Sequence, residues 1–390
     1  MELIYLDHNA TTPLHGDVRQ TILDTMDIFG NASSLHPFGF TARQRVEQVR
    51  KQIMEVLNAS EGHVIFTSCG SEANNLALKG LVCSGSQCAH SMCHANSFHY
   101  ITTAVEHPSV IQTFECLQHI GAEVTILPVD QYGMVDPDAV RNAIKANTIL
   151  VSVMMGNNEV GTIMPVGEIG KVCREKGVTF HVDAVQTVGK MPIHVDDQSI
   201  DLLSLSGHKL NAPKGIGALY VRKTISLCPL IHGGHQEDNL RAGTENNLGI
   251  FALGSALTVA AEKGEKDAAE TRRLRDRLHQ KLQDNLDGIK LNGHPEHRLP
   301  GTLNLSFDRI DGAAILEMLS MQGVAVSSGS ACSSGDDEPS HVLTAMGLDP
   351  QSARSSVRIS VGYGNTEEQI DKAAEIIIKT VNQLRKLSPL

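Results

Sequence analysis

Short runs of hydrophobic residues alternate with helical or polar stretches between residues 62 and 222. Seven runs have the length and β-branched content of strands, at 63–68, 99–105, 123–129, 148–155, 178–183, 201–206 and 216–221. The run TILVSVMM at 148–155 lacks the alternation of a half-exposed strand, as is typical of a sheet covered by helices on both faces. Helical periodicity at 138–145 and 166–176 is followed by C-terminal helix signals at Asn147 and Gly177. This pattern predicts a large α/β domain.

The pattern changes after Asn246, where a long helical stretch at 252–286 is apolar at first and strongly charged later. Such a change suits a helix that connects two domains. The remainder contains short apolar runs at 302–307, 324–329 and 357–362, a helix-like stretch at 313–321 and a terminal helix from Thr366. It predicts a smaller α+β domain. We expect residues 15–255 to form the large domain, and residues 1–14 with 256–390 to form the small one.

The composition is that of a globular protein, because 41% of the 390 residues are hydrophobic and 20% are charged. A formal charge of -11 argues against nucleic acid and anionic membranes as partners. No stretch approaches the ~20 apolar residues that span a bilayer, and Glu2 and Asp7 do not fit a secretory peptide. Eight cysteines are too few for a disulfide scaffold. We therefore expect a cytoplasmic protein.

Several common cofactor motifs are missing from the sequence. It contains no G-x-G-x-x-G opening a helix, no G-x-x-x-x-G-K-[ST] and no H-E-x-x-H. The sequence therefore provides no motif evidence for a dinucleotide, nucleoside-triphosphate or zinc-protease site.

Polar residues stand at the ends of the predicted strands. Lys209 follows the strand 201–206 and is either a solvated surface lysine or an amine directed into a cleft. Asp183 ends the strand 178–183 and is either a helix N-cap or a buried carboxylate. The stretch 69–74 forms a strand-to-helix turn whose amides would face an anion, which is a weak signal alone.

These clusters gain weight together with His107, which stands at another strand end. Pyridoxal phosphate requires a lysine for a Schiff base, a carboxylate at its ring nitrogen, an anion site for its phosphate and a group packed on its ring. Ligand sites in open α/β sheets lie outside the carboxyl ends of the strands. The sequence therefore predicts a pyridoxal-phosphate site at that edge.

A series of motifs spans essentially the whole chain: YLDHNATTP, NASSLHPFG, FTSCGSEANN, EHPSV, MMGNNEVGT, HVDAVQTVGK, SLSGHKLNAPKG, GGHQEDNLRAGTEN, SSGSACSSG and VRISVG. In these motifs the chain resembles the class V pyridoxal-phosphate cysteine desulfurases of the NifS and IscS group. The tracts FTSCGSEA, HKLNAPKG and EPSHVLTAMG are more similar to the NifS subtype. The resemblance implies a fold-type I PLP-dependent transferase, with a seven-stranded, mainly parallel sheet and a smaller α+β domain.

The resemblance also implies roles toward the cofactor. Lys209 would bind it covalently, Asp183 would hold the pyridine nitrogen, and Gln186 would meet the phenolic oxygen. His107 would stack on the ring. The cofactor phosphate would be held by Gly70, Ser71, Ser206 and His208, and by Thr244 of a second subunit. This last role implies a homodimer.

For the substrate, the resemblance implies that Arg358 and Asn158 hold the carboxylate of L-cysteine. Cys332 stands between Gly329 and Gly335 in a serine-rich stretch, which is typical of a mobile loop. An isolated cysteine is usually a small buried hydrophobic residue, but the resemblance makes Cys332 the nucleophile. L-cysteine would then yield L-alanine and a Cys332 persulfide, whose sulfur passes to an iron-sulfur scaffold or another acceptor protein.

The chain departs from the family pattern at three places. One is Ser71, where threonine is more usual; serine keeps the hydroxyl group, so we expect little effect. Asp238 follows Glu237 where a basic residue is expected, near a dimer contact or the rim of the cleft. Cys83, Cys88 and Cys93, with His90 and His94 among them, could hold zinc, but the C-x-x-C spacing is absent. We favour a surface loop and expect no metal site.

Two alternatives to a cysteine desulfurase remain. One is another class V activity, such as a selenocysteine lyase or an aminotransferase. The other is a non-catalytic subunit that serves as an assembly platform, against which the presence of Lys209, Asp183, His107 and Cys332 argues.

Overall fold

A seven-stranded sheet forms the centre of the computed structural model, which describes residues 3–81, 98–328 and 339–387. Its order is β2-β8-β7-β6-β5-β3-β4. The strands are β2 (His63–Thr67), β3 (His99–Thr103), β4 (Glu123–Leu127), β5 (Thr148–Met154), β6 (Thr179–Asp183), β7 (Leu202–Ser206) and β8 (Gly217–Val221). All are parallel except β8, which is antiparallel to β2 and β7. The predicted strands and the mainly parallel sheet are confirmed.

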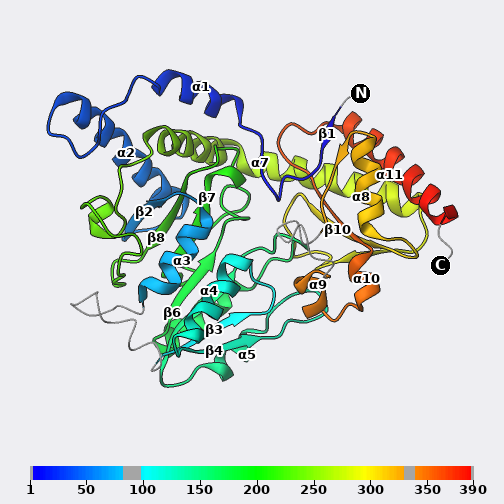
Figure 1. Cartoon of the computed structure of the whole chain (residues 1–390), viewed down its shortest axis with the longest axis horizontal. Coiled ribbons are helices and arrows are strands. Elements are labelled where there is room, and N and C mark those ends of the chain that lie inside the picture. Colours follow the sequence, from blue (N-terminus) through cyan, green and yellow to red (C-terminus); the bar gives the residue numbers. More distant parts are fainter. Residues whose placement is uncertain (1–2, 82–97, 329–338, 388–390) are drawn as a thin grey trace.

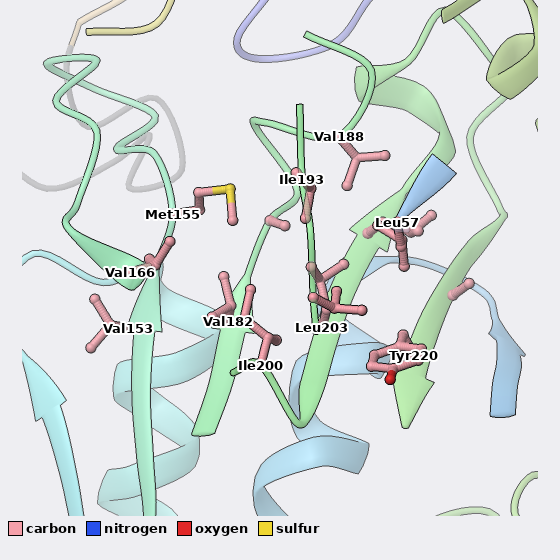
Figure 2. Packing of buried hydrophobic residues seen from close by; sticks show 14 of the residues in the cluster. Leu57, Val153, Met155, Val166, Val182, Val188, Ile193, Ile200, Leu203 and Tyr220 are labelled. Carbon is pink, nitrogen blue, oxygen red and sulfur yellow. The ribbon is translucent and has the colours of Figure 1, made fainter. Parts of the chain in front are cut away.

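Alternate residues of the central strands enter two different hydrophobic clusters. In β5, Leu150 packs on one face of the sheet, whereas Val151 and Val153 pack on the other. Side chains of a strand alternate between faces, so the largely apolar sequence TILVSVM serves two cores at once. Figure 2 shows part of the larger cluster, in which Val153 lies near Val182 and Leu203 of the neighbouring strands.

Helices cover both faces of this sheet (Figure 1). One face packs against α3 (Gly70–Gly80) and α4 (Pro108–His119). The other packs against α2 (Pro37–Val56), α6 (Val166–Lys176) and the first part of α7 (Asn247–Asn285). α1 (Gly16–Thr25) contacts α7, and α5 (Pro137–Ala143) contacts α6. The coverage predicted from the unbroken apolar runs is confirmed for the central strands, while the edge strand β4 is only partly buried.

The helix boundaries follow local sequence signals. α6 ends as predicted, because Gly177 adopts a left-handed conformation with φ of 67° and its amide caps the helix. α5 begins one residue before the predicted stretch, since the side chain of Asp136 accepts a hydrogen bond from the amide of Asp138 and Pro137 occupies the first turn. It ends at Ala143, two residues before the prediction.

A second group of elements packs around its own hydrophobic cluster at the other end of α7 (Figure 1). An antiparallel sheet orders β12 (Ser356–Ser360), β10 (Thr302–Phe307) and β9 (Ile289–Asn292). Short β1 (Ile4–Tyr5) pairs with β11 (Val324–Ala325). α8 (Gly312–Met321) and α11 (Glu367–Leu387) pack together. α10 (Pro350–Arg354) contacts β10 and α9 (His341–Ala345), but the buried apolar residues of α9 and α10 belong to the large-sheet cluster.

Helix α7 has 39 residues and contributes to both parts of the molecule. Ile250 and Leu257 belong to the large-sheet cluster, whereas Leu274 and Leu282 belong to the second cluster. The predicted division between residues 255 and 256 falls inside this helix and stays a prediction. Within the three described ranges, no helix has the length and apolar character needed to cross a membrane.

Candidate active site

A cavity of about 500 Å³ opens at the carboxyl ends of the central strands. Asp183 ends β6 and Ser206 ends β7, and β3 leads into His107. The N-terminus of α3 lies beside them, while Arg358 reaches the cavity from β12. The predicted residues on its wall are Gly70, Ser71, His107, Asn158, Asp183, Gln186, Ser206, His208, Lys209 and Arg358. The fold thus brings together side chains from both parts of the chain.

Asp183 is buried at the end of β6, with 6% of its surface exposed. Its Oδ2 accepts a hydrogen bond of 2.7 Å from Nδ2 of Asn74, and its Oδ1 accepts one of 3.0 Å from the amide of Val185. Sequence reasoning missed Asn74, although it stands four residues after Gly70 and therefore on the same face of α3. These bonds hold a carboxylate in a fixed orientation at the cavity wall.

Lys209 ends the 3-10 turn Gly207–Lys209 that follows β7. Its Nζ donates a hydrogen bond of 2.7 Å to the carbonyl of Ala10, and it also bonds to the carbonyl of Asn9. The N-terminal segment therefore supplies main-chain acceptors to the amine, a contribution that the motif YLDHNATTP did not reveal. The amine is directed into the cavity and is not a solvated surface lysine.

His107 forms the N-cap of α4, and its Nδ1 accepts a hydrogen bond of 3.1 Å from the amide of Ser109. This bond leaves Nε2 to carry the proton of the neutral ring. Burial lowers the pKa of His107, and this outweighs the opposing charge of Asp183. A neutral imidazole is therefore available at the cavity wall.

Ser206 and His208 lie opposite the first turn of α3, where Gly70 and Ser71 present the helix N-terminus. A side chain at position 70 would approach Cγ2 of Val185 to 2.7 Å, so only glycine fits this approach. Burial, and then the charges of Lys209, Lys214 and Lys190, lower the pKa of His208 to about 4. A helix N-terminus with hydroxyl and imidazole groups beside it is suited to an anion.

Gln186 lies on the same wall, where both ends of its amide are engaged. Nε2 donates a hydrogen bond of 3.0 Å to the carbonyl of Asn9, and Oε1 accepts one of 3.2 Å from Nζ of Lys190. Neither contact of this amide was predicted from the sequence.

Arg358 is almost fully buried, and its guanidinium is partly engaged by the protein. Nη2 contacts Oδ1 of Asp7 at 2.9 Å, and Nη1 donates to the carbonyl of Asn158 at 3.1 Å. Nε is buried and has no hydrogen-bond partner among the described residues. Two of the five N–H groups of the guanidinium are thus engaged, and the other three have no hydrogen-bond partner among the described residues.

Glu159 and His341 also line the cavity and were not predicted. Burial raises the pKa of Glu159 to about 7, against the lowering effects of Ser340 and Arg358. The hydroxyl of Ser340 donates to Oε2 of Glu159 at 2.5 Å, and Nε2 of His341 lies 3.0 Å from the carbonyl of Glu106. Residues 340–341 are thus joined to the large-sheet part of the chain.

Of the remaining predicted residues, Thr244 is not among the described residues that line the cavity. Thr244 is exposed and lies in the segment that precedes α7. Cys332 and the stretch with Cys83, Cys88 and Cys93 lie outside the described residues. The described ranges contain no group of three or more His, Cys, Asp or Glu side chains placed for a metal ion. Asp238 is exposed, while Glu237 beside it pairs with Arg50 at 2.9 Å.

The cavity fits pyridoxal phosphate by the chemistry of its residues. The Oγ of Ser206 is buried without a hydrogen-bond partner in the described part of the chain, as expected for a group that awaits a ligand oxygen. An amine, a buried carboxylate and a helix N-terminus share this one cavity. These are the groups that the cofactor requires.

Comparison with known proteins agrees with this arrangement. Residues 4–373 match the family model of class V aminotransferases. The chain belongs to the class V aminotransferase family. A curated relative from Methanosarcina thermophila, named cysteine desulfurase IscS, is 44% identical over 99% of this chain and 94% of its own. A cysteine desulfurase of a Nostoc species is 44% identical over 100% and 95% of the two chains.

Solved structures related to this class V chain agree as well. One described as a NifS-like protein has a TM-score of 0.89 and 35% identity, covering 98% of this chain and 100% of its own. Another, described as SspA in complex with cysteine, has a TM-score of 0.80 and 36% identity, covering 92% and 99%. This class V chain is therefore a fold-type I enzyme that uses pyridoxal phosphate. Relatives with IscS and NifS names both match, so the NifS subtype stays a prediction.

Proposed function

We propose that this class V enzyme is a cysteine desulfurase, which converts L-cysteine into L-alanine and transfers the sulfur to Cys332. One observation carries the proposal: Lys209, Asp183 and Arg358 line a single cavity. An amine, a carboxylate and a guanidinium in that cavity provide a cofactor link, a ring partner and a carboxylate receptor. The names of the relatives support the same activity.

Pyridoxal phosphate supplies an electron sink when it is bound. Lys209 would hold it covalently, Asp183 would bind its ring nitrogen and Gln186 its phenolic oxygen. His107 would lie against its ring. The phosphate would be held by Gly70, Ser71, Ser206 and His208. The fixed orientation of the Asp183 carboxylate supports this assignment, because both of its oxygens already accept hydrogen bonds.

Arg358 would bind the carboxylate of L-cysteine through its fork of N–H donors. Its Nε, which has no hydrogen-bond partner among the described residues, supports this role, and its contacts with Asp7 and with the carbonyl of Asn158 hold the guanidinium in place. Asn158 would add its side-chain amide to the same carboxylate. With the carboxylate fixed in this way, the Cα proton would be presented to the amine of Lys209, which acts as the base.

Cys332 would attack the sulfur of the substrate as a thiolate. An S–S bond forms and the bond between Cβ and sulfur breaks, so that sulfur leaves at the oxidation level of a persulfide. The electron pair of the broken bond stays with the carbon skeleton, which is reduced to alanine. Of the two thiol protons, one ends on the alanine methyl group and the other on the persulfide.

The active enzyme would be a homodimer in which Thr244 completes the phosphate site of the partner. Thr244 is exposed and is not among the described residues that line its own cavity, which supports a role toward another subunit. Exposed apolar side chains gather in the segment around α2: Phe29, Leu35, Phe38 and Phe40. Asn247 donates a hydrogen bond to the carbonyl of Gly30 at 2.8 Å and so joins this segment to the start of α7. A second copy of the chain would cover this surface.

The persulfide sulfur would pass to an iron-sulfur scaffold or to another acceptor protein in the cytoplasm. The formal charge of -11 favours a protein acceptor over nucleic acid.

The activity is tested by incubating the purified enzyme with L-cysteine and measuring alanine. We expect catalytic alanine formation that is lost in Cys332→Ser while the cofactor absorbance is retained. Alanine formation that persists in Cys332→Ser would contradict the proposed role. Turnover of selenocysteine alone would indicate a selenocysteine lyase, keto-acid formation an aminotransferase, and absence of all turnover an assembly subunit.

A further inference from the structure

Lys190 lies behind the wall of the cofactor cavity, where it faces a second cavity. This second cavity, of about 200 Å³, lies between the N-terminal segment, α7 and residues 299–302. Asn9 and Lys209 line both cavities, and they separate one from the other. Lys190 reaches the shared wall through its hydrogen bond to Gln186.

Lys190 is a poorly solvated amine whose charge is not balanced by a carboxylate of the described chain. Burial, and then the charge of Lys209, lower its pKa to about 7, and no acidic group of the described residues acts in the opposite direction. A lysine in such surroundings needs a compensating interaction. The carbonyl oxygen of Gln186, at 3.2 Å from Nζ, provides one.

The contact with Lys190 determines which end of the Gln186 amide faces which neighbour. An ammonium group has only donors, so the charged form of Nζ requires the oxygen of the amide. Rotation of the amide by half a turn would place its NH2 group against Nζ and its oxygen against the carbonyl of Asn9. Both resulting contacts would be repulsive. Lys190 therefore holds Oε1 behind the wall and directs Nε2 toward Asn9 and the cofactor cavity.

We propose that Lys190 is a positioning residue for the cofactor, which it serves by orienting the amide of Gln186 so that a donor faces the phenolic oxygen. The inference rests on the proposed contact between Gln186 and that oxygen. The orientation matters because a phenolic oxygen carrying negative charge is stabilised by an N–H donor and destabilised by a carbonyl oxygen. Lys190 itself need not touch the cofactor.

The test uses the purified holoenzyme and the visible absorbance of its cofactor, measured as a function of pH without cysteine. Lys190→Met removes the donor to Gln186 and keeps an apolar chain of similar length. We expect the midpoint of the absorbance change to rise by about half to one pH unit, and cofactor binding to weaken about tenfold. Lys190→Arg retains the donors and should stay near the wild type. The exposed Lys214 gives a matched control, since Lys214→Met removes a nearby charge without touching Gln186.

A double-variant comparison separates positioning from a direct effect of charge. In a Gln186→Ala background, Lys190→Met should produce no further shift of the midpoint if Lys190 acts through the amide. The same shift in both backgrounds would overturn the proposal, as would an unchanged midpoint in the single variant. Because the readout requires no cysteine, these outcomes are independent of the desulfurase activity. Absence of any cofactor band in the wild type would instead count against the proposed function itself.

Discussion

The side-chain amide of Asn74 donates a hydrogen bond to Oδ2 of Asp183 at 2.7 Å, inside the protein. Nδ2 of Asn74 also donates to Oγ of Ser109 at 2.9 Å, so one amide joins α3, the end of β6 and the start of α4. The contact thus holds the Asp183 carboxylate in a fixed orientation where a ring nitrogen would be bound.

Asn74→Ala should weaken this support. Loss of a hydrogen bond to a charged group costs about 1.5–3 kcal/mol, so we expect cofactor binding to weaken at least tenfold and turnover to fall. Cofactor affinity is measured by titrating the apoenzyme. Asn75→Ala is the matched control, because the side chain of Asn75 donates to the carbonyl of Ser71 within the helix and not to Asp183. Equal cofactor affinity of the two variants would contradict the role of Asn74.

Arg358→Lys should separate substrate binding from cofactor binding. Lysine keeps the positive charge near Asp7 but loses the planar fork, so a bidentate contact with the substrate carboxylate is no longer possible. We expect KM for cysteine to rise at least tenfold, with the cofactor absorbance unchanged. Arg358→Ala would also leave Asp7 without its ion pair and is the less specific variant. An unchanged KM in Arg358→Lys would refute the carboxylate role.

Glu106 makes the stability of the fold depend on pH. Burial raises the pKa of its side chain to about 8, whereas an exposed glutamate has a pKa near 4.5. Between these values the folded protein holds a proton that the unfolded chain has released, so the free energy of unfolding decreases as pH rises, by up to about 1.4 kcal/mol per pH unit. The stabilisation of the folded protein by protonated Glu106 is complete below pH 4.5 and is lost as pH rises through about 8.

Glu106→Gln should reduce that dependence, because an amide does not titrate. Its oxygen can accept the bonds that Oε1 receives from Thr103 and from the amide of Met154. We expect the melting temperature of the variant to fall less than that of the wild type between pH 5.5 and 8.5. The exposed Glu115 on α4 provides the control variant Glu115→Gln. Parallel melting curves for wild type and Glu106→Gln across this range would count against the raised pKa.

A mixture of two inactive variants tests the exchange of Thr244 between subunits. In a hybrid dimer with one Lys209→Ala subunit and one Thr244→Ala subunit, the site of the first subunit would lack both Lys209 and the threonine from its partner. The site of the second subunit would have both residues. Random pairing should then restore about a quarter of the wild-type activity, measured at limiting cofactor. If Thr244 served its own subunit, the hybrid would contain no intact site and the mixture would stay inactive.

The sheet and the strand-end residues could be predicted because their signals are local. Buried strands read as continuous apolar runs, and the carboxyl ends of parallel strands meet at one edge, which brings Asp183 and the lysine after β7 together. The position of β8 between β2 and β7 could not be predicted, since a strand pattern does not specify its neighbours.

Contacts made through the main chain could not be predicted either. The carbonyl of Asn9 accepts hydrogen bonds from Gln186 and Lys209, yet a carbonyl group is present at every residue and leaves no sequence signal. Lys190 stands four residues after Gln186 in a turn outside any named helix, so helical spacing gave no reason to pair the two. Its importance follows from tertiary packing.

The location of the transferred sulfur tests the central claim most directly. The enzyme is treated with stoichiometric L-cysteine without reductant, its thiols are blocked, and its peptides are examined by mass spectrometry. We predict one added sulfur on the peptide that contains Cys332, and none on that peptide in Cys332→Ala, whose cofactor absorbance should still respond to cysteine. Added sulfur on the peptide with Cys83, Cys88 and Cys93, together with continued alanine formation by Cys332→Ala, would contradict the account.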